Sequence, residues 1–240
     1  MNTFNQHTGF FITGTDTEVG KTLVSAALIL KLKEVGKNAV GFKPVVAGTY
    51  SSADGRELNE DLEALRIASN LEWGSIELCP YILSNPAAPH LVAQAQGIEL
   101  SIGVITQAFQ NISEKFNAVV VEGAGGFLVP LNDREDLSDI AMALGLPVIL
   151  VVGMRLGCIN HALLTYEALK IRNLRLAGWV ANTLSDEMPL LQENIETLKS
   201  RISEPYLGTI PPLPAKLQKP VNGPYSLDAL RFAAEHIKLP

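Results

Sequence analysis

The fold is decided by Gly14-Thr15-Asp16-Thr17-Glu18-Val19-Gly20-Lys21-Thr22, near the amino end of the chain. Just before it, residues 9–13 form an apolar run typical of a buried strand. Just after it, residues 22–35 carry apolar side chains at helical spacing. A strand, a glycine-bounded loop and a helix in this order make a phosphate-binding loop, where backbone N–H groups and the helix N-terminus surround phosphate oxygens. In such a loop Lys21 reaches the β- and γ-phosphates of a nucleotide, and the Thr22 hydroxyl binds Mg²⁺.

The spacing of this loop is unusual. Five residues separate Gly14 from Gly20 where the usual pattern has four, and Thr15 stands in place of the usual first glycine. The alternative interpretation is a strand-turn-helix unit with a chance Gly-Lys-Thr. The strand pattern before the loop and the helix pattern after it favour the phosphate-binding interpretation.

Strand and helix patterns alternate along the rest of the chain. Several expected strands are apolar at every position, which is typical of parallel strands covered by helices on both faces. We therefore expect one α/β domain over residues 1–240, with a doubly wound, mostly parallel sheet between two layers of helices. The expected strands are 9–13, 38–42, 118–122, 147–152, 176–181 and 206–210, and the expected helices are 22–35, 59–68, 101–115, 136–144, 160–172, 189–201 and 227–237. Residues 48–57, 75–90 and 211–224 are expected to be loops or irregular segments.

Composition excludes several classes of protein. The chain has 240 residues, 47% of them hydrophobic and 18% charged, which is typical of a globular protein. Its net charge is −6 without a long basic run, so we expect no nucleic-acid or membrane partner. The cysteines, Cys79 and Cys158, form no CxxC pair, which argues against a disulfide framework or a zinc site. Residues 1–7 lack the pattern of a signal peptide, and the apolar run 144–153 is too short to cross a membrane, so we expect a cytoplasmic protein.

Polar residues follow three of the expected strands. Lys43 comes after residues 38–42, Glu122 ends residues 118–122, and Asn182 ends residues 176–181. The carboxyl ends of parallel strands lie at one edge of a sheet, so these side chains are expected beside the phosphate-binding loop. A carboxylate in this place is typical of the acid that is directed at Mg²⁺. The alternatives are a surface turn for Glu122 and a solvated loop lysine for Lys43.

Other residues leave more than one interpretation open. The run Gly123 to Gly126 allows close approach to a ligand, but a tight turn explains it nearly as well. Asp61, at the start of a predicted helix, is either a metal ligand or an acid favoured by the helix dipole, and without a family the dipole is preferred. His90 is expected to be a hydrogen-bonded structural residue. Trp73 and Trp179 are expected in or near the core.

Five blocks of the sequence resemble the dethiobiotin synthetase family, and they occur in the family's order from residue 9 to about residue 214. They are residues 14–22, Gly41-Phe42-Lys43-Pro44-Val45, Val121-Glu122-Gly123-Ala124-Gly125-Gly126, Leu156-Gly157-Cys158-Ile159-Asn160-His161-Ala162 and Gly178-Trp179-Val180-Ala181-Asn182. The resemblance implies an ATP- and Mg²⁺-dependent cyclo-ligase of biotin biosynthesis. Its substrates would be 7,8-diaminononanoate, CO₂ and ATP, and its products dethiobiotin, ADP and phosphate. One amine takes up CO₂ to form a carbamate, ATP phosphorylates the carbamate, and the second amine closes the cyclic urea.

The resemblance also assigns roles to residues of this chain. Catalysis is assigned to Lys21, Lys43 and Thr17, and Mg²⁺ binding to Thr22, Asp61 and Glu122. Nucleotide binding is assigned to Thr15, Asp16, Glu18, Val19, Gly20, Lys21, Thr22, Glu122, Gly125, Asn182, Pro211 and Leu213, with Asn182 on the adenine. Binding of the diamine or its carbamate is assigned to Thr17, Lys43, Ala47, Leu156, Gly157, Cys158 and Ile159.

The family resemblance further implies a homodimer in which the helix that begins near Leu156 binds the substrate carboxylate across the subunit interface. Cys158 is then a packing residue rather than a nucleophile. Ala47 departs from the family, which often has a serine at this position. The lost hydrogen bond would be worth about 1 kcal/mol.

Three other classes of protein share parts of this pattern. A molecular switch of the partition or septum-site kind carries a second lysine early in the phosphate-binding loop, and Asp16 stands at that position here. An amide synthetase of the cobyrinic-acid type needs a fused glutamine-hydrolysing domain, for which the chain has no room. A small-metabolite kinase would make a stable phosphate ester, whereas a carboxylase would release phosphate only with CO₂ and diamine present.

Overall fold

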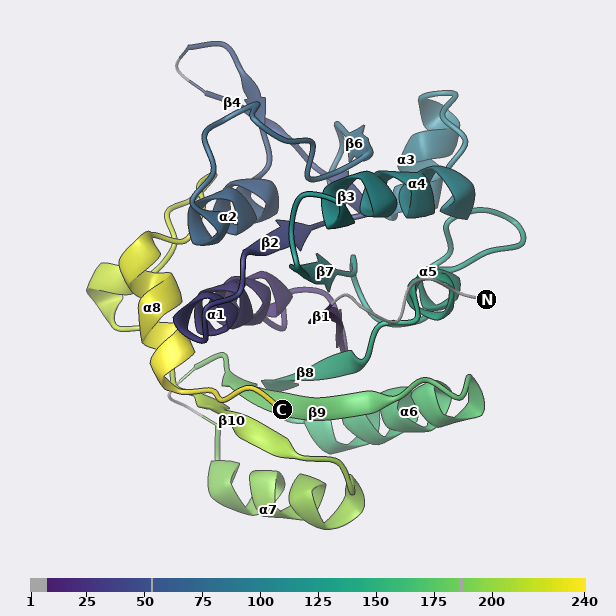
Figure 1. Cartoon of the computed structure of the whole chain (residues 1–240). Helices are drawn as coiled ribbons and strands as arrows, with labels where there is room; N and C mark the ends of the chain where they lie inside the picture. The colour runs from purple at the N-terminus through teal and green to yellow at the C-terminus, as the bar shows by residue number, and fades with distance from the viewer. Residues whose placement is uncertain (1–7, 53, 186–187) are drawn as a thin grey trace.

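Six parallel strands form the central sheet of the protein (Figure 1). The structure is a computed structural model that describes residues 8–52, 54–185 and 188–240. The strand order is β10-β9-β8-β1-β7-β2. The bounds are β1 (Thr8–Gly14), β2 (Ala39–Phe42), β7 (Ala118–Glu122), β8 (Val148–Met154), β9 (Leu176–Thr183) and β10 (Tyr206–Ile210). The prediction for residues 1–7 concerns residues outside the described ranges.

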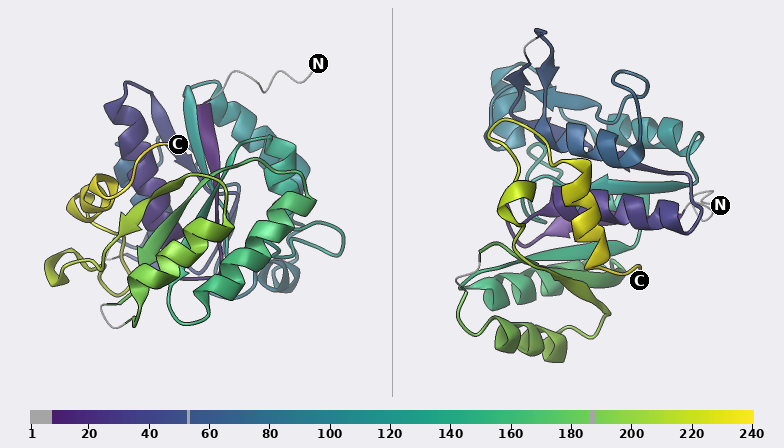
Figure 2. Two further views of the ribbon diagram at one scale, coloured as in Figure 1. Left: turned by 90° about the horizontal axis from the view of Figure 1, so that it is seen from below. Right: turned by 90° about the vertical axis from the view of Figure 1, so that its left-hand side faces the viewer.

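Helices cover both faces of this sheet (Figure 2). On one face lie α1 (Lys21–Glu34), α2 (Glu60–Ser69) and α8 (Leu227–Glu235). On the other lie α4 (Ile102–Ser113), α5 (Leu137–Leu144), α6 (Cys158–Ile171) and α7 (Leu191–Arg201). The doubly wound α/β fold predicted from the sequence is therefore confirmed. Within the described residues, no helix has both the length and the apolar character needed to cross a bilayer.

The core lies on both faces of the central strands. Every residue of β7 and β8 is buried, which explains why these strands are apolar without alternation. Helix α1 is buried along most of its length, because α2 and α8 pack against it from outside the sheet. Trp179, on β9, is fully buried as predicted.

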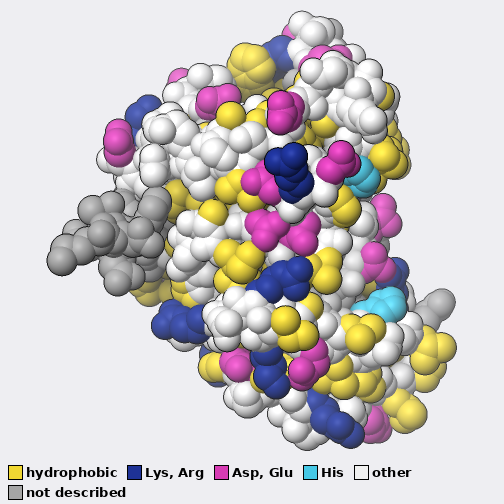
Figure 3. Space-filling view, turned by 90° about the vertical axis from the view of Figure 1, so that its right-hand side faces the viewer, with side chains coloured by type: hydrophobic (Ala, Val, Ile, Leu, Met, Phe, Trp, Pro, Cys, Tyr) yellow, Lys and Arg dark blue, Asp and Glu magenta, His cyan; other side chains and the backbone are white. Residues whose placement is uncertain are grey.

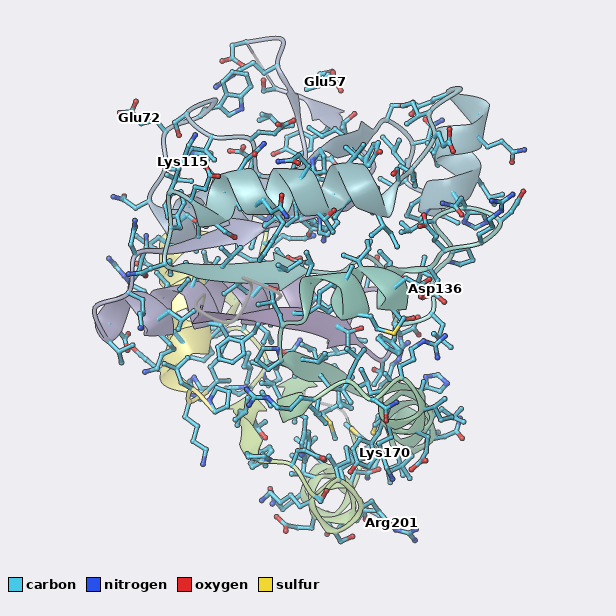
Figure 4. The ribbon with its side chains drawn as sticks, turned by 45° about the vertical axis from the view of Figure 1, so that its right-hand side comes forward. Glu57, Glu72, Lys115, Asp136, Lys170 and Arg201 are labelled. Carbon is cyan, nitrogen blue, oxygen red and sulfur yellow. The ribbon has the colours of Figure 1, made fainter. Side chains whose placement is uncertain are left out.

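Local signals in the sequence explain where two helices begin. The Asn59 side chain accepts hydrogen bonds from the backbone of Asp61 and Leu62, so Asn59 is the N-cap of α2. Helix α5 begins with a capping box between Asp136, labelled in Figure 4, and Asp139. These caps fix the position of each helix on its loop.

All three segments predicted to be loops or irregular contain regular structure. Residues 211–224 include a short 3₁₀ helix, η2 (Ala215–Leu217). Residues 48–57 were expected to be a polar loop, but β4 (Tyr50–Ser51) and β5 (Glu57–Leu58) pair there as a short antiparallel hairpin. Residues 75–90 contain β6 (Tyr81–Leu83), which pairs in parallel with β3 (Val45–Ala47), and the start of α3 (Pro89–Ala95). These strands have only two or three residues, too few to show a period in the sequence. Proline at the first position of α3 is compatible with a helix, because the N–H that it lacks has no partner there.

The predictions for Trp73 and His90 were wrong in part. Trp73 is 52% exposed, and its ring lies 4.9 Å from the guanidinium carbon of Arg56 rather than in the core. Stacking on a cation lets this large ring stay at the surface. His90 lies in the first turn of α3, and its buried Nδ1 has no hydrogen-bond partner among the described residues.

Candidate nucleotide-phosphate and metal site

The phosphate-binding loop connects β1 to α1 at the carboxyl edge of the sheet. The backbone N–H of Thr15 donates to the carbonyl oxygen of Val151 on β8, at 3.0 Å. Gly20 takes the N-cap position of α1 with φ +90°, and Lys21 and Thr22 are the first residues of the helix. The Lys21 ammonium lies over the loop and donates to the carbonyl oxygen of Asp16, at 2.8 Å. The strand-loop-helix unit predicted from the sequence is therefore present.

Asn182, near the end of β9, packs against this loop and forms a hydrogen bond with it. Its Nδ2 donates to the carbonyl oxygen of Val19 at 2.9 Å, and the side chain is buried. Gly20 packs so closely that a Cβ added to it would lie 2.1 Å from the same nitrogen. The predicted contact of Asn182 with adenine stays a prediction, since the amide nitrogen is used by the loop in this structure.

Four polar side chains meet beside the loop. The Lys43 ammonium lies 2.7 Å from Asp61 Oδ2 and 2.6 Å from Glu122 Oε1. The Thr22 hydroxyl is 2.7 Å from an oxygen of each of the same two carboxylates. Lys43 is 3% exposed and Glu122 0%. The surface-turn and solvated-lysine alternatives are therefore excluded, and we call Thr22, Lys43, Asp61 and Glu122 the polar cluster.

The fold explains why these residues meet. Strands β2 and β7 are neighbours and parallel, so Lys43 and Glu122 leave the sheet at the same edge. Asp61 stands in the first turn of α2, which begins at the Asn59 cap and packs against β2. A buried carboxylate is tolerated only when it is paired, and Lys43 supplies the opposite charge.

Burial and neighbouring charges set the pKa values of the two lysines. Burial, and after it the nearby charge of Lys43, lower the pKa of Lys21 to about 8 against the opposing effect of the carboxylates. Burial would also lower the pKa of Lys43, but Asp61 and Glu122 outweigh it and hold this pKa above its ordinary value. Lys43 therefore stays an ammonium at neutral pH.

The polar cluster has the oxygen atoms that a hard divalent cation prefers. Two carboxylates and one hydroxyl converge, and the buried Oε2 of Glu122 has no hydrogen-bond partner among the described residues. Among all the residues that the structure describes, no group of three or more His, Cys, Asp or Glu side chains is placed to hold a metal. Mg²⁺ in nucleotide sites is usually bound by one or two carboxylates together with substrate phosphates and water, so this donor set fits it.

The glycine-rich turn after β7 faces the loop. A Cβ added to Gly125 would lie 3.5 Å from the Thr17 hydroxyl, so this turn approaches Thr17 closely. The backbone N–H of Thr17 donates to Asp16 Oδ1 at 2.8 Å, and Glu18 adopts a left-handed φ of +58°. The structure thus brings Gly125 to the loop, although no residue pattern distinguished it from an ordinary turn.

The segment that begins α6 also lies next to the loop. Arg155 pairs with the carboxylate of Asp16, which joins the start of this segment to the phosphate-binding loop. Leu156 is 98% exposed, Gly157 caps the helix, Ile159 is half-buried and Cys158 is buried in the core. Arg155 was not predicted to be a site residue. A basic residue directly before the Leu156 block was the signal that could have identified it.

Three further predicted residues lie at strand ends. Ala47 is the last residue of β3, and Pro211 and Leu213 follow the carboxyl end of β10. All three are half-buried. Their assigned contacts with substrate or adenine stay predictions.

The fold and the loop define a P-loop nucleotide-binding protein. A family model described as "AAA domain" matches residues 8–220. Among solved structures, the septum site-determining protein MinD from Pyrococcus horikoshii, complexed with Mg-ADP, superposes with a TM-score of 0.54 at 17% identity, covering 95% of each chain. The MinC:MinD complex of Aquifex aeolicus gives a TM-score of 0.53 at 17% identity, covering 94% of this chain and 86% of that one. At this identity the likeness shows the fold alone.

Curated relatives identify the particular family. The chain is 50% identical to the ATP-dependent dethiobiotin synthetase of Ralstonia nicotianae over 85% of its own length and 89% of the relative's. It is 50% identical to the enzyme of the same name from Aromatoleum aromaticum, over 84% and 89% of the two chains. The protein belongs to the ATP-dependent dethiobiotin synthetase family.

Proposed function

We propose that the protein is an ATP-dependent dethiobiotin synthetase, a ligase of biotin biosynthesis. It carboxylates 7,8-diaminononanoate with CO₂ and closes the ring, converting ATP to ADP and phosphate. The observation that supports this most strongly is the polar cluster beside the phosphate-binding loop, in a chain half identical to enzymes of this name. The switch-type alternative is disfavoured, because Asp16 stands where those proteins carry a lysine, and the MinD structures share only the fold.

The reaction needs positioning and charge neutralisation more than covalent help from the protein. A carbamate oxygen attacks the γ-phosphorus of ATP, and ADP leaves with the electron pair of the broken P–O bond. The second amine then attacks the carbamoyl carbon, and phosphate leaves as the cyclic urea closes. Lys21 and Lys43, which both lie beside the loop, would stabilise the negative charge that meets at the phosphorus.

Mg²⁺ would be held by Thr22, Asp61 and Glu122 and would neutralise charge on the bound triphosphate. Thr17, on the phosphate-binding loop, lies close to the glycine turn at Gly125, where it would contact the carbamate or the transferring phosphoryl group. Ala47 provides no hydroxyl to the substrate, so a water molecule would take the place of the serine that the family often has.

The test of this function is an assay with ATP, Mg²⁺, labelled bicarbonate and 7,8-diaminononanoate. We expect an acid-stable labelled product and phosphate release that requires both the diamine and CO₂. Folded protein that binds ATP but forms no labelled product would contradict the proposal. A phosphate ester formed without CO₂ would indicate a kinase instead.

ATP binding is expected to weaken at alkaline pH. The pKa of Lys21 is lowered to about 8 from 10.5, so its ammonium begins to lose its proton just above neutral pH. Bound phosphate favours the ammonium, hence the dissociation constant of ATP should rise as pH increases from about 8 to about 10. Isothermal titration calorimetry across this range measures the dissociation constant. Lys21→Met is the control, and it should bind ATP weakly with an affinity that does not change with pH.

The free energy of unfolding of the protein without ATP should rise over the same pH range, whereas ATP affinity falls. Between about 8 and 10.5 the unfolded chain binds more protons at Lys21 than the folded one, so this residue makes the free energy of unfolding rise with pH. The destabilising effect of burying this charge is complete below about 8 and disappears as pH approaches 10.5. If ATP affinity and the free energy of unfolding depend on pH in the same way in the wild type and in Lys21→Met, the lowered pKa of Lys21 is contradicted.

We also propose that the protein acts as a homodimer with α6 at the interface. The face that carries α5 and α6 shows hydrophobic side chains between charged ones (Figure 3). Leu164 and Ile171 are exposed and stand seven residues apart, on one side of α6, and Leu156 is almost fully exposed just before it. Apolar side chains grouped like this are typical of a surface that another molecule covers.

Leu164→Glu is expected to dissociate the dimer and to reduce turnover, because the site for the substrate carboxylate would then be incomplete. Sedimentation velocity and the KM for the diamine measure the two effects. Val35→Glu is a matched control, since Val35 is an exposed apolar residue just after α1. A wild-type enzyme that is monomeric at its assay concentration and fully active would contradict the dimer.

A further inference from the structure

The ligand-free polar cluster already holds a cation, the ammonium of Lys43. Lys43 Nζ lies 2.7 Å from Asp61 and 2.6 Å from Glu122, between the two carboxylates that the proposed function assigns to Mg²⁺. The lysine side chain is 4% exposed and the Glu122 side chain 1%. The Asp61 side chain is 32% exposed, so Glu122 is the buried member of the pair of carboxylates. Two neighbouring carboxylates repel each other unless a positive charge lies between them, and here that charge is supplied by the protein itself.

We propose that Lys43 and a divalent metal ion exchange on these carboxylates. An ion that is bound by Asp61 and Glu122 takes the oxygen atoms that now accept hydrogen bonds from Lys43, so the ammonium has to leave them. The remaining oxygen of Glu122, buried and without a partner among the described residues, is one acceptor that the ammonium leaves unsatisfied. The exchange rests on the proposed function for its choice of metal ligands.

A consequence for binding order follows from this competition. Metal alone must displace an ammonium that forms two short ion pairs, one buried with Glu122 and one partly buried with Asp61, so the free protein should bind Mg²⁺ weakly. The phosphates of ATP provide further ligands to the metal and an alternative anionic partner for Lys43. Metal and nucleotide should therefore bind together, and the displaced lysine becomes available to the phosphates only when the metal is in place.

Lys43→Met tests the exchange without nucleotide or turnover. Thermal unfolding is followed while MgCl₂ is added to the free protein, and the dissociation constant is obtained from the rise in Tm. We expect Lys43→Met to bind Mg²⁺ at least about tenfold more tightly than the wild type, because the competitor is gone. Lys43→Met with Glu122→Gln should lose this gain.

Lys21→Met is the matched control. It removes the same charge from the same site, but Lys21 donates to the carbonyl oxygen of Asp16 and not to the carboxylates. If Lys43 acts only through its general positive charge, the two variants will gain affinity equally, and the exchange is refuted. A folded Lys43→Met protein that binds Mg²⁺ no more tightly than the wild type refutes it as well.

A second measurement uses the wild-type protein and does not depend on the stability of a variant. The rate at which an amine-reactive acetylating reagent modifies Lys43 is measured by mass spectrometry with and without Mg²⁺. Lys33 is the internal reference. Displacement predicts faster labelling of Lys43 when Mg²⁺ is present, and a rate unchanged at saturating metal contradicts it. Failure of this exchange would leave carboxylase activity intact, whereas failure of the proposed function would appear in the labelled-bicarbonate assay.

Discussion

Lys43→Met is expected to lower kcat by about a thousandfold while the protein still binds ATP. Removing one preorganised donor to a developing negative charge typically costs about 10²–10³ in kcat, and Lys43 is a charged donor in a buried site. ATP binding should persist, because the phosphate-binding loop and Lys21 are separate from β2 and keep their contacts. Steady-state turnover and ATP calorimetry on the same preparation measure both effects.

The same substitution should destabilise the ligand-free protein. It leaves the buried Glu122 and the partly exposed Asp61 side by side without their counter-charge. The loss of one partner from a buried ion pair such as Lys43–Glu122 typically costs about 3–5 kcal/mol. Urea unfolding measures the loss. Lys33→Met is the control, since the Lys33 ammonium donates to a backbone carbonyl oxygen on α2 and touches no carboxylate there. A Lys43→Met enzyme with wild-type kcat would show that the role assigned to Lys43 is wrong.

Gly20→Ala is the second substitution with a large expected effect. Gly20 has φ +90°, a conformation that strains any residue with a Cβ, and the added carbon would lie 2.1 Å from Asn182 Nδ2. The loop would have to move, or Asn182 would lose its hydrogen bond to Val19. We expect ATP affinity to fall by more than about a hundredfold, together with a loss of about 2–4 kcal/mol in the free energy of unfolding.

Gly36→Ala separates the two causes of this effect. Gly36 has φ +80°, close to that of Gly20, but a Cβ there would meet nothing within 4 Å. Gly36→Ala should lower the free energy of unfolding by about 1 kcal/mol, because only backbone strain is added, and ATP binding should not change. If both variants lose the same free energy of unfolding and both bind ATP normally, the close packing of Gly20 against Asn182 does not contribute to ATP binding.

The sequence predicted the fold well where a segment was long or uniformly apolar. The strands β7 and β8 were identified because buried parallel strands appear as continuous apolar runs, and the helix α1 because its several turns place apolar residues at helical spacing. The hairpin of β4 and β5, the pair β3 and β6, and helix α3 were missed. Their pairing depends on neighbours distant in the sequence, and such short segments carry no period of their own.

For the candidate site, the sequence provided residue types and strand ends but not contacts. Glu122 and Lys43 were predicted at the correct edge, because parallel strands end together. The position of Asp61 against both of them was not available from residue patterns, since it depends on how α2 packs on β2. Arg155 was missed for a related reason: its partner, Asp16, is 139 residues away in the chain.

The sequence by itself determined the alternation of strands and helices, the phosphate-binding loop and the family, because these are properties of local pattern and of identity along the chain. Only the tertiary structure decided that Lys43 lies between Asp61 and Glu122, that Asn182 supports the loop under Gly20, and that Trp73 stays at the surface. The physical reason is that burial and charge pairing depend on distances in space, and those distances are fixed only when α2, β2, β7 and β9 pack together.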